Sequence, residues 1–442
     1  MKERIVLLLI IFTLWVFLFI FQNYMDKNWA TFTIIGFTIL YCIYMQIAFK
    51  HRTRQLKKHP KVVNENYKPF VSIMIPAHNE EDVISQTIEN VAKLDYPQYE
   101  IIVIDDRSTD NTAGVLQELT KTYPNLITFS RKDGDFPGKS AVLNDALKYA
   151  HGEAILVLDA DARVNPDFLT KLVPALEDED VGAVQARKVI SNKNDNLLTR
   201  CQSNELTLDT HFQVGRDAVR GAVELRGNGE IIKRIALNDI GGWNNYTITD
   251  DLDMSTRLQI KGWDVRFCPE VCVYEEAILH YIPLLKQRRR WVEGSIRRYL
   301  EHFEEVLTSK DMSLRVSLDM TAYITEFLMP FWMTSEICFQ FFRFVKGVDN
   351  WILSSIAISI MFCIFFSFAL MYSLRKYDGL KPFENLVQSV TTCLYMVFLW
   401  FPVVFFIVFK IIFCKKTMDW GKTTHGTAKT TIVEGKETLT SQ

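Results

Sequence analysis

The sequence has almost no excess of either charge. Its 50 Lys and Arg residues and 52 Asp and Glu residues leave a net charge of -2 over 442 residues. Chains that bind nucleic acids usually carry a strongly basic face or arm, so this balance gives no indication of a nucleic-acid partner.

Cysteine patterns typical of zinc or disulfide sites are also missing. The eight cysteines are scattered, and most lie in or beside apolar stretches, where cysteine packs as a small hydrophobic residue. Cys268 and Cys272 are four positions apart, which differs from the Cys-x-x-Cys spacing of zinc and redox sites. The sequence therefore predicts neither a disulfide framework nor a zinc site.

Two common nucleotide-binding motifs are absent as well. The loop that ends in Gly138-Lys139-Ser140 has only three residues between Gly134 and Gly138, one of them Pro137, whereas a Walker motif needs four. There is also no Gly-x-Gly-x-x-Gly fingerprint of a dinucleotide site. These absences argue against an ATPase and against an NAD enzyme.

The chain does contain long apolar segments, and they lie at its two ends. Residues 5–49 and about 317–413 are strongly apolar, whereas the middle has the composition of a globular domain. No small-residue cleavage site follows the first run, which favours a pair of membrane helices, at 5–21 and 30–49, over a signal peptide. The basic residues just after them place the following domain on the cytoplasmic side.

This pattern divides the chain into four expected regions. We expect an N-terminal transmembrane hairpin with a basic linker at 1–62, a cytoplasmic domain at 63–310, interfacial or transmembrane helices at 311–416, and a polar, disordered tail at 417–442. The C-terminal region has three candidate spans, near 320–342, 351–373 and 389–413. The first contains Glu326 and Pro330, so we expect it to be interfacial or broken.

The middle region alternates strands with helices. Apolar runs rich in β-forming residues occur at 70–76, 99–104, 126–130 and 154–158, with helical spacing of apolar residues between them. Such alternation predicts an α/β fold with a mostly parallel central sheet and helices on both faces. Ligands bind beyond the carboxyl ends of the strands in sheets of this kind.

Acidic side chains gather at that edge. The fourth run ends in Asp159 and Asp161, which strand alternation places on the same side. A divalent cation shared with phosphates would relieve their repulsion. Asp105-Asp106 ends the second run, and Lys139 lies on a neighbouring loop. Each of these charged groups alone is typical of a helix cap or a surface charge, but together they predict a binding site for a metal-bound nucleotide diphosphate.

Three later segments add to this site. Gly227-Asn228-Gly229 suggests either a backbone that a ligand approaches closely or a hairpin turn. Thr249–Asp253 brings three acidic residues to a helix start, more than capping needs. Gln287–Trp291 is basic with an aromatic residue and can clamp a diphosphate, and Arg297 and Arg298 continue this stripe. The alternative for the stripe is a basic helix that binds anionic lipid at the membrane surface.

Taken together, these motifs resemble the family-2 glycosyltransferases of the GT-A fold, in their processive, membrane-embedded branch. The resemblance covers about residues 70–305 and rests on Asp105-Asp106, Asp159-Ala160-Asp161, Thr249-Asp250-Asp251 and Gln287–Trp291. Within that branch, the segments 181–188, 224–229, 241–253 and 290–300 look like those of the cyanobacterial-type β-monoglucosyldiacylglycerol synthases. Glu230 departs from the Gln that is usual in this subgroup.

The resemblance implies an enzyme that transfers glucose from UDP-glucose, with inversion, to the hydroxyl of 1,2-diacylglycerol. It implies that Asp251 is the catalytic base, with Asp250 and Asp253 as local rivals, and that Asp159 and Asp161 hold Mg²⁺ or Mn²⁺. The residues implied to bind the UDP-sugar are Glu80, Asp105, Asp106, Lys139, Asp159, Gln287, Arg290 and Trp291. A processive polysaccharide synthase that uses a UDP-sugar is the alternative enzyme, and a non-enzymatic membrane receptor is the alternative class.

Overall fold

A central β-sheet organises the globular part of the protein. The computed structural model describes residues 2–24, 66–347 and 352–416, together with isolated positions between 36 and 64. The sheet has eight strands in the order β3-β2-β1-β4-β7-β6-β8-β5. They are β1 (Val71–Ala77), β2 (Tyr99–Asp105), β3 (Leu126–Ser130), β4 (Ala154–Val157), β5 (Arg163–Val164), β6 (Val181–Ile190), β7 (Glu230–Lys233) and β8 (Asp264–Glu275).

The four strands predicted from the sequence form one half of the sheet. β3, β2, β1 and β4 are parallel neighbours, which confirms the prediction from strand–helix alternation. β7 then runs antiparallel between β4 and β6, and β6 pairs in parallel with β8, which carries the short antiparallel β5. The sheet is therefore mostly parallel, and its two halves meet at β4 and β7.

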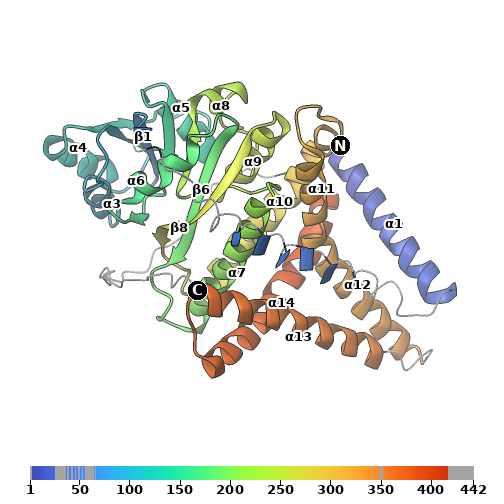
Figure 1. Ribbon diagram of the computed structural model, residues 1–442. Helices are drawn as coiled ribbons and strands as arrows, with labels where there is room; N and C mark the ends of the chain where they lie inside the picture. Colours follow the sequence, from blue (N-terminus) through green and yellow to red (C-terminus); the bar gives the residue numbers. More distant parts are fainter. Residues whose placement is uncertain are drawn as a thin grey trace.

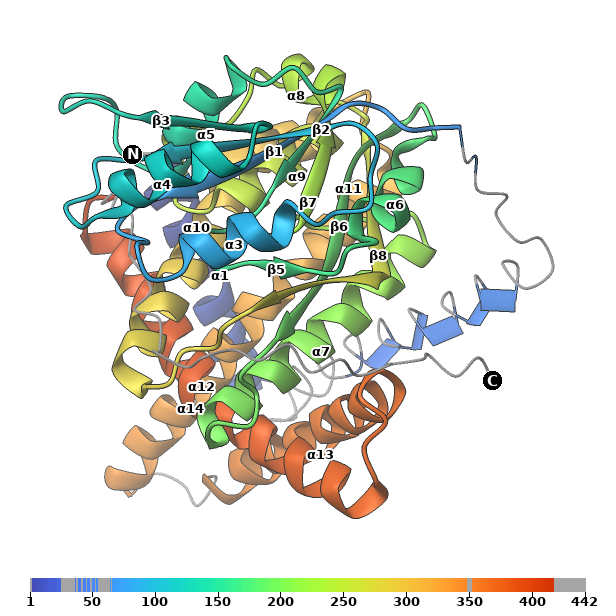
Figure 2. The ribbon, with the colours of Figure 1, turned by 90° about the vertical axis from the view of Figure 1, so that its left-hand side faces the viewer.

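Alternate residues of the strands face two separate hydrophobic cores. Ile73 and Ile75 of β1 pack with the helices of one face, whereas Met74 between them packs with the helices of the other. The first face is covered by α3 (Ile84–Val91), α4 (Thr112–Thr122), α6 (Phe168–Leu172) and the 3₁₀ turn Val173–Leu176. The second is covered by α5 (Lys139–Leu147), α8 (Arg234–Asp239) and α9 (Asp250–Ile260) (Figures 1 and 2).

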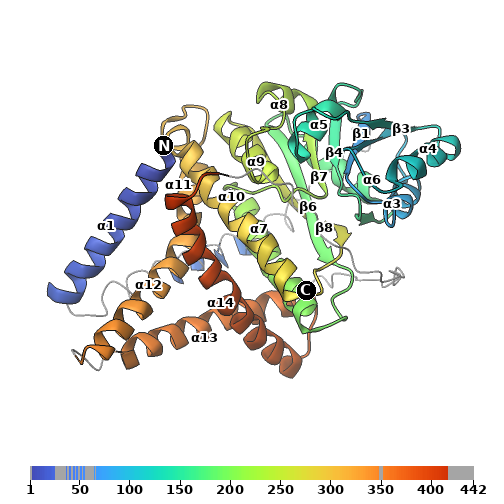
Figure 3. The ribbon, with the colours of Figure 1, turned by 180° about the vertical axis from the view of Figure 1, so that it is seen from behind.

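A layer of longer helices lies beside the sheet domain. It consists of α1 (Lys2–Tyr24), α7 (Leu197–Ala218), α10 (Tyr281–Thr308), α11 (Leu314–Tyr323), α12 (Thr325–Val345), α13 (Ile352–Tyr377) and α14 (Pro382–Phe413). Figures 1 and 3 show α12, α13 and α14 together on one side of the molecule, with α10 running alongside α14. Leu7 and Ile11 of α1 join the core that α10, α12 and α14 form.

Among the described residues, one helix, α14, is long and apolar enough to cross a membrane. Of the expected N-terminal spans, the first coincides with α1, and the second lies outside the described residues apart from isolated positions. The candidate span near 320–342 is divided between α11 and α12 at Ile324, but α12 continues through Pro330 without a break. The proline removes one backbone donor, but its neighbours Met329 and Phe331 are buried, and this packing holds the helix together.

Candidate active site

The carboxyl ends of the strands border one large cavity, which continues between the long helices. Its volume is about 570 Å³. We call the part lined by Glu80, Lys139, Asp159 and Asp161 the polar end. The part lined by Phe212, Phe365, Phe366, Ala369, Cys393, Met396, Val397 and Phe401, from α7, α13 and α14, is the apolar end. A single cavity thus joins a charged region at the sheet to an apolar region among the helices.

The two carboxylates predicted to hold a metal both line the polar end. Asp159 and Asp161 follow β4, as the end of the apolar run predicted. Lys139 Nζ, at the start of α5, donates to Asp159 Oδ1 at 2.7 Å and to the carbonyl of Gly227 at 2.9 Å. Burial alone would lower the pKa of Lys139, but Asp159 and Asp250 outweigh it and raise the pKa above its usual value. Lys139 is therefore a permanent cation beside Asp159.

The pair Asp105 and Asp106 lies at the same edge but takes no part in the lining of the cavity within the described chain. Asp105 accepts a hydrogen bond from the Ser108 amide at 3.2 Å. Asp106 is buried and forms ion pairs with Arg107 at 2.9 Å and Arg131 at 2.8 Å. These bonds hold the loop after β2 in place. A contact of either aspartate with the nucleoside remains a prediction.

The start of α9 brings two of its three acidic residues into the cavity. Asp250 and Asp251 line it, whereas Asp253 is fully buried outside it, paired with Arg257 at 2.6 Å and His302 at 3.0 Å. Asp253 is thereby held by two partners and is a poor candidate for the base. Burial, together with the charge of Asp250, raises the pKa of Asp251 to about 6. A carboxylate with such a pKa is ionised at neutral pH and still accepts a proton readily.

Glu230, the first residue of β7, is affected by the charges of this pair. It is fully buried and accepts a hydrogen bond from the Gly227 amide at 3.0 Å. Burial, with the charges of Asp251 and Asp250, raises its pKa to about 8. Glu230 is therefore protonated at neutral pH and presents an uncharged group. Gly227 and Gly229 both have positive φ, of 75° and 72°, which glycine adopts without strain and which is compatible with both interpretations of this segment.

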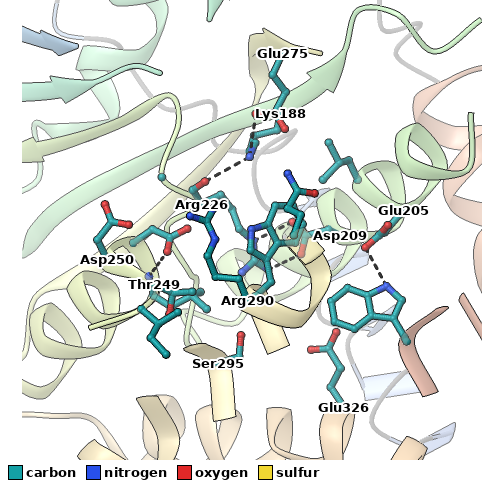
Figure 4. A pocket seen from close by; sticks show the side chains of 18 of the residues that line it. Lys188, Glu205, Asp209, Arg226, Thr249, Asp250, Glu275, Arg290, Ser295 and Glu326 are labelled. Atoms are coloured by element: carbon teal, nitrogen blue, oxygen red, sulfur yellow. Dashed lines mark hydrogen bonds and ion pairs between the residues drawn. The ribbon is translucent and has the colours of Figure 1, made fainter. Parts of the chain in front are cut away.

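The predicted residues of the Gln287–Trp291 segment also reach the cavity. Gln287, Arg290 and Trp291 of α10 line it, and Figure 4 shows Arg290 in its middle. The carbon at the centre of the Arg288 guanidinium lies 4.1 Å from the centre of the Trp291 ring, a cation–π contact that orients the ring.

The neighbouring arginines do not form the expected basic stripe on the surface. Arg288 is buried with Glu205 at 2.8 Å, and Arg298 is buried with Glu224 at 2.7 Å. Arg297 is buried with Glu293 at 3.0 Å. The prediction that these three residues meet the diphosphate or the membrane surface was wrong. The helices and loops packed around α10 cover their side chains, and each guanidinium has a carboxylate partner.

Several cavity residues were missed from the sequence. They are Lys188, Glu205, Asp209, Arg226, Glu275, Ser295 and Glu326. Lys188 and Glu275 lie at the ends of β6 and β8, and Arg226 pairs with Asp209 of α7 (Figure 4). Lys188 and Glu275 could have been found as charged residues near the ends of strands, but β8 was not recognised as a strand from the sequence.

Comparisons with known proteins agree on the family of the chain. A family model described as "Glycosyltransferase like family 2" matches residues 69–294. The β-monoglucosyldiacylglycerol synthase of Nostoc sp. (strain PCC 7120) is 36% identical over 404 residues, which cover 90% of this chain and 84% of that protein. The poly-β-1,6-N-acetyl-D-glucosamine synthase of Staphylococcus epidermidis is 27% identical over 281 residues, covering 63% of this chain and 66% of that protein.

A solved structure shares the fold. The mannosyltransferase of Pyrobaculum calidifontis, in complex with GDP-Man and Mn²⁺, aligns with a TM-score of 0.58 at 20% identity. The alignment covers 83% of this chain and 98% of that one. At this identity the likeness concerns the fold alone, and it supports the expected GT-A architecture.

Proposed function

The chain belongs to the family-2 glycosyltransferases, and we propose that it transfers glucose from UDP-glucose to the free hydroxyl of 1,2-diacylglycerol. The observation that carries the proposal is the continuity of the cavity, from carboxylates and a lysine at the sheet to aromatic and aliphatic side chains among the helices. A charged donor and a long-chain lipid need these two environments in one site. The similarity to the Nostoc enzyme supports the same acceptor.

In this proposal Asp251 acts on the acceptor. An alcohol is a weak nucleophile, so a base must remove its proton while the new bond forms. The acceptor oxygen bonds to the anomeric carbon as Asp251 takes the proton. The bond between that carbon and the diphosphate breaks, and its electron pair leaves with UDP. Attack from the side opposite UDP inverts the configuration, giving a β-glucoside from an α-linked donor.

The leaving diphosphate is held by cations in this proposal. Lys139 pairs with Asp159, and Arg290 lines the same cavity; both cations can neutralise the charge of the phosphates. Gln287 adds an uncharged donor on the same helix as Arg290. Trp291, oriented by Arg288, would cover the sugar.

We include Mg²⁺ or Mn²⁺ in the proposal because Asp159 and Asp161 fit such a cation. Carboxylate oxygens are the ligands that hard divalent cations prefer, and both side chains face the cavity. The described residues contain no cluster of three or more His, Cys, Asp or Glu side chains for a metal, so phosphate oxygens of the donor would complete the coordination. When bound, the cation offsets the charge that accumulates on the departing diphosphate.

We also propose that the protein is embedded in a membrane, with the sheet domain at 63–310 on the cytoplasmic side. The outer side of α14 exposes large apolar side chains, including Phe383 at 79% and Phe398 at 71%. α13 likewise exposes Phe368 at 63%. Such a surface is costly in water and suits lipid. The lipid acceptor would then reach the apolar end of the cavity from the bilayer.

The test is to incubate the full chain in lipid nanodiscs with UDP-[¹⁴C]glucose, with and without added 1,2-diacylglycerol. We expect a labelled product that is soluble in chloroform, migrates as a monoglucosyl lipid and forms at a rate that depends on diacylglycerol. Label in a water-soluble fraction of high molecular weight, formed without diacylglycerol, would contradict the proposal. That outcome would favour a polysaccharide synthase, the activity named for the Staphylococcus relative.

A further inference from the structure

An ion pair between two strands lies in the part of the cavity where a donor sugar would be placed. Lys188 of β6 donates from Nζ to Glu275 Oε2 of β8 at 2.9 Å, and both residues line the cavity. The two side chains are 12% and 15% exposed, so they face the cavity rather than bulk solvent. Figure 4 shows Lys188 with its bonds to Glu275 and to the backbone beside Arg226.

The pair is connected to the residues that would hold the diphosphate. The Asn228 side chain donates to Glu275 Oε2 at 3.2 Å and accepts from the Asp159 amide at 3.2 Å. Burial alone would lower the pKa of Lys188, but Glu275, Asp159 and Asp251 raise it above its usual value. Lys188 is therefore an ammonium group that is affected by the charges of Asp159, a proposed metal ligand, and Asp251, the proposed base.

In the proposed reaction, the hexose would lie in this part of the cavity. Its anomeric carbon has to sit between the diphosphate, near Asp159, and the acceptor oxygen, near Asp251. Lys188 Nζ is also 5.9 Å from the centre of the Trp291 ring, an apolar surface against which a sugar ring can pack. The hydroxyl groups of the hexose on carbons other than the anomeric carbon would then face the Lys188–Glu275 pair.

The chemistry of the pair suits hydroxyl groups. A hydroxyl both donates and accepts hydrogen bonds, and an ammonium beside a carboxylate offers one partner of each kind. A purely structural role explains the pair less well, because β6 and β8 are already paired from Val181 to Ile190. A buried ion pair also adds little stability compared with apolar residues of the same size.

We propose that Lys188 and Glu275 bind hydroxyl groups of the donor hexose and determine which hexose the enzyme accepts. The inference rests on the proposed function in one respect, namely that the donor is a UDP-hexose. It does not depend on the identity of the acceptor.

The test compares binding of UDP, UDP-glucose and the four UDP-monodeoxyglucoses lacking the 2-, 3-, 4- or 6-hydroxyl, for the wild type and Lys188→Met in nanodiscs. We expect the wild type to bind at least one deoxy donor about 10- to 100-fold more weakly than UDP-glucose, the range for a hydrogen bond to a charged group. Lys188→Met should bind UDP-glucose and that deoxy donor equally, within about threefold. It should bind UDP as the wild type does, because UDP lacks the hexose that the pair would contact.

Two further variants separate recognition from folding. Glu275→Gln keeps the shape of the side chain and should also reduce the discrimination between donors. Arg266 lies on β8, as Glu275 does, but outside the cavity, and Arg266→Met breaks its ion pair with Asp217, which is 2.6 Å long. It should lower the melting temperature and leave the donor preference unchanged.

Three results would overturn the assignment. One is an unchanged donor preference in Lys188→Met, which would make the pair structural. Another is a fall in UDP affinity equal to the fall in UDP-glucose affinity, which would make Lys188 a phosphate contact. The third, no binding of any UDP-hexose by the wild type, would refute the proposed donor as well. Transfer to an acceptor other than diacylglycerol would refute only the proposed acceptor, and the binding experiment would still decide the role of the pair.

Discussion

Gly294 of α10 lies so close to Thr249 that a β-carbon at position 294 would overlap the Thr249 methyl group and come within 2.7 Å of the hydroxyl oxygen. Thr249 is the residue that precedes α9, and Asp251 follows two positions later. The helix that carries Arg290 and the helix that carries the proposed base therefore touch through a glycine. The absence of a side chain at 294 is what allows both to line the same cavity.

Gly294→Ala should push α9 and α10 apart. It should lower the transfer rate by about 10- to 100-fold, because a displacement of catalytic groups by about 1 Å can slow a reaction about 100-fold. Adding Thr249→Ser removes the methyl group that the new β-carbon would meet, so the double variant should regain part of the activity. Rates of transfer for the two variants provide the measurement. No recovery in the double variant would mean that the contact is not the cause.

Asp251→Asn should reduce transfer by at least about 10²-fold, as expected for removal of a general base. UDP affinity should stay within about twofold of the wild type, since the phosphates are bound by other residues. The matched control is Asp253→Asn, which breaks the pairs with Arg257 and His302 and should lower the melting temperature more than the rate. A parallel loss of UDP affinity in Asp251→Asn would identify Asp251 as a donor ligand instead.

The rate should also depend on pH through the same residue. Asp251 acts as a base only when ionised, and its pKa is raised to about 6. Transfer by the wild type should therefore be low below pH 6 and rise through that pH to a plateau. Single-turnover rates between pH 5 and pH 8 would test this, and a rate that is flat across this range would contradict it.

The raised pKa of Glu230 predicts an effect on stability. This residue holds its proton in the folded protein up to about pH 8, whereas an unfolded glutamate has lost it above a pKa of 4.5. Its contribution to folding is therefore complete below pH 4.5 and is lost as the pH rises towards 8. Glu230→Gln, which cannot ionise, should melt a few degrees higher than the wild type at pH 8 and about equally at pH 5. Equal melting temperatures at both pH values would mean that Glu230 carries no such cost.

Removal of divalent cations should abolish transfer. Chelation with EDTA is expected to stop the reaction, and Mg²⁺ or Mn²⁺ should restore it. Asp161→Asn should not be restored at any concentration of either metal, because it removes one of the two carboxylates at the end of β4. Full activity of chelated, dialysed protein would mean that these aspartates only shape the turn.

The strand ends and helix starts that border the cavity could be predicted from short stretches of sequence. The apolar run before Asp159 ends at the sheet edge because a buried strand must give way to polar residues there, and parallel neighbours bring those ends together. The segments that contain Asp251 and Arg290 were identified in the same way, from acidic residues at a helix start and from a basic segment with an aromatic residue, whereas the roles of these two residues rest on the family resemblance. Each of these signals lies within a few residues of the chain.

The remaining part of the site depends on contacts between distant segments. Lys188 and Glu275 meet because β6 and β8, which are far apart in the sequence, are parallel neighbours in the sheet, and nothing near either residue indicates that pairing. Arg298 looked like a surface charge because its partner Glu224 lies in a loop far away in the sequence. Pairing between distant residues decides whether a charged side chain faces a ligand or is neutralised inside the protein.

The apolar end of the cavity gives a direct test of the lipid acceptor. Ala369 of α13 lines it, whereas the adjacent Phe368 is 63% exposed on the outer side of the same helix. Ala369→Trp would fill space that an acyl chain needs and should lower transfer to a long-chain diacylglycerol at least about tenfold, following the steric cost of overpacking. Phe368→Trp places the same side chain outside and should leave the rate within about twofold of the wild type.

The length of the acceptor sharpens this comparison. A diacylglycerol with short acyl chains needs less of the apolar end, so Ala369→Trp should impair its glucosylation less than that of the long-chain lipid. UDP affinity should not change, because Ala369 belongs to the apolar end and the phosphates bind at the polar end. If Ala369→Trp slowed both lipids equally, or neither, the acyl chains would have to lie elsewhere, and the apolar end would not be the acceptor site.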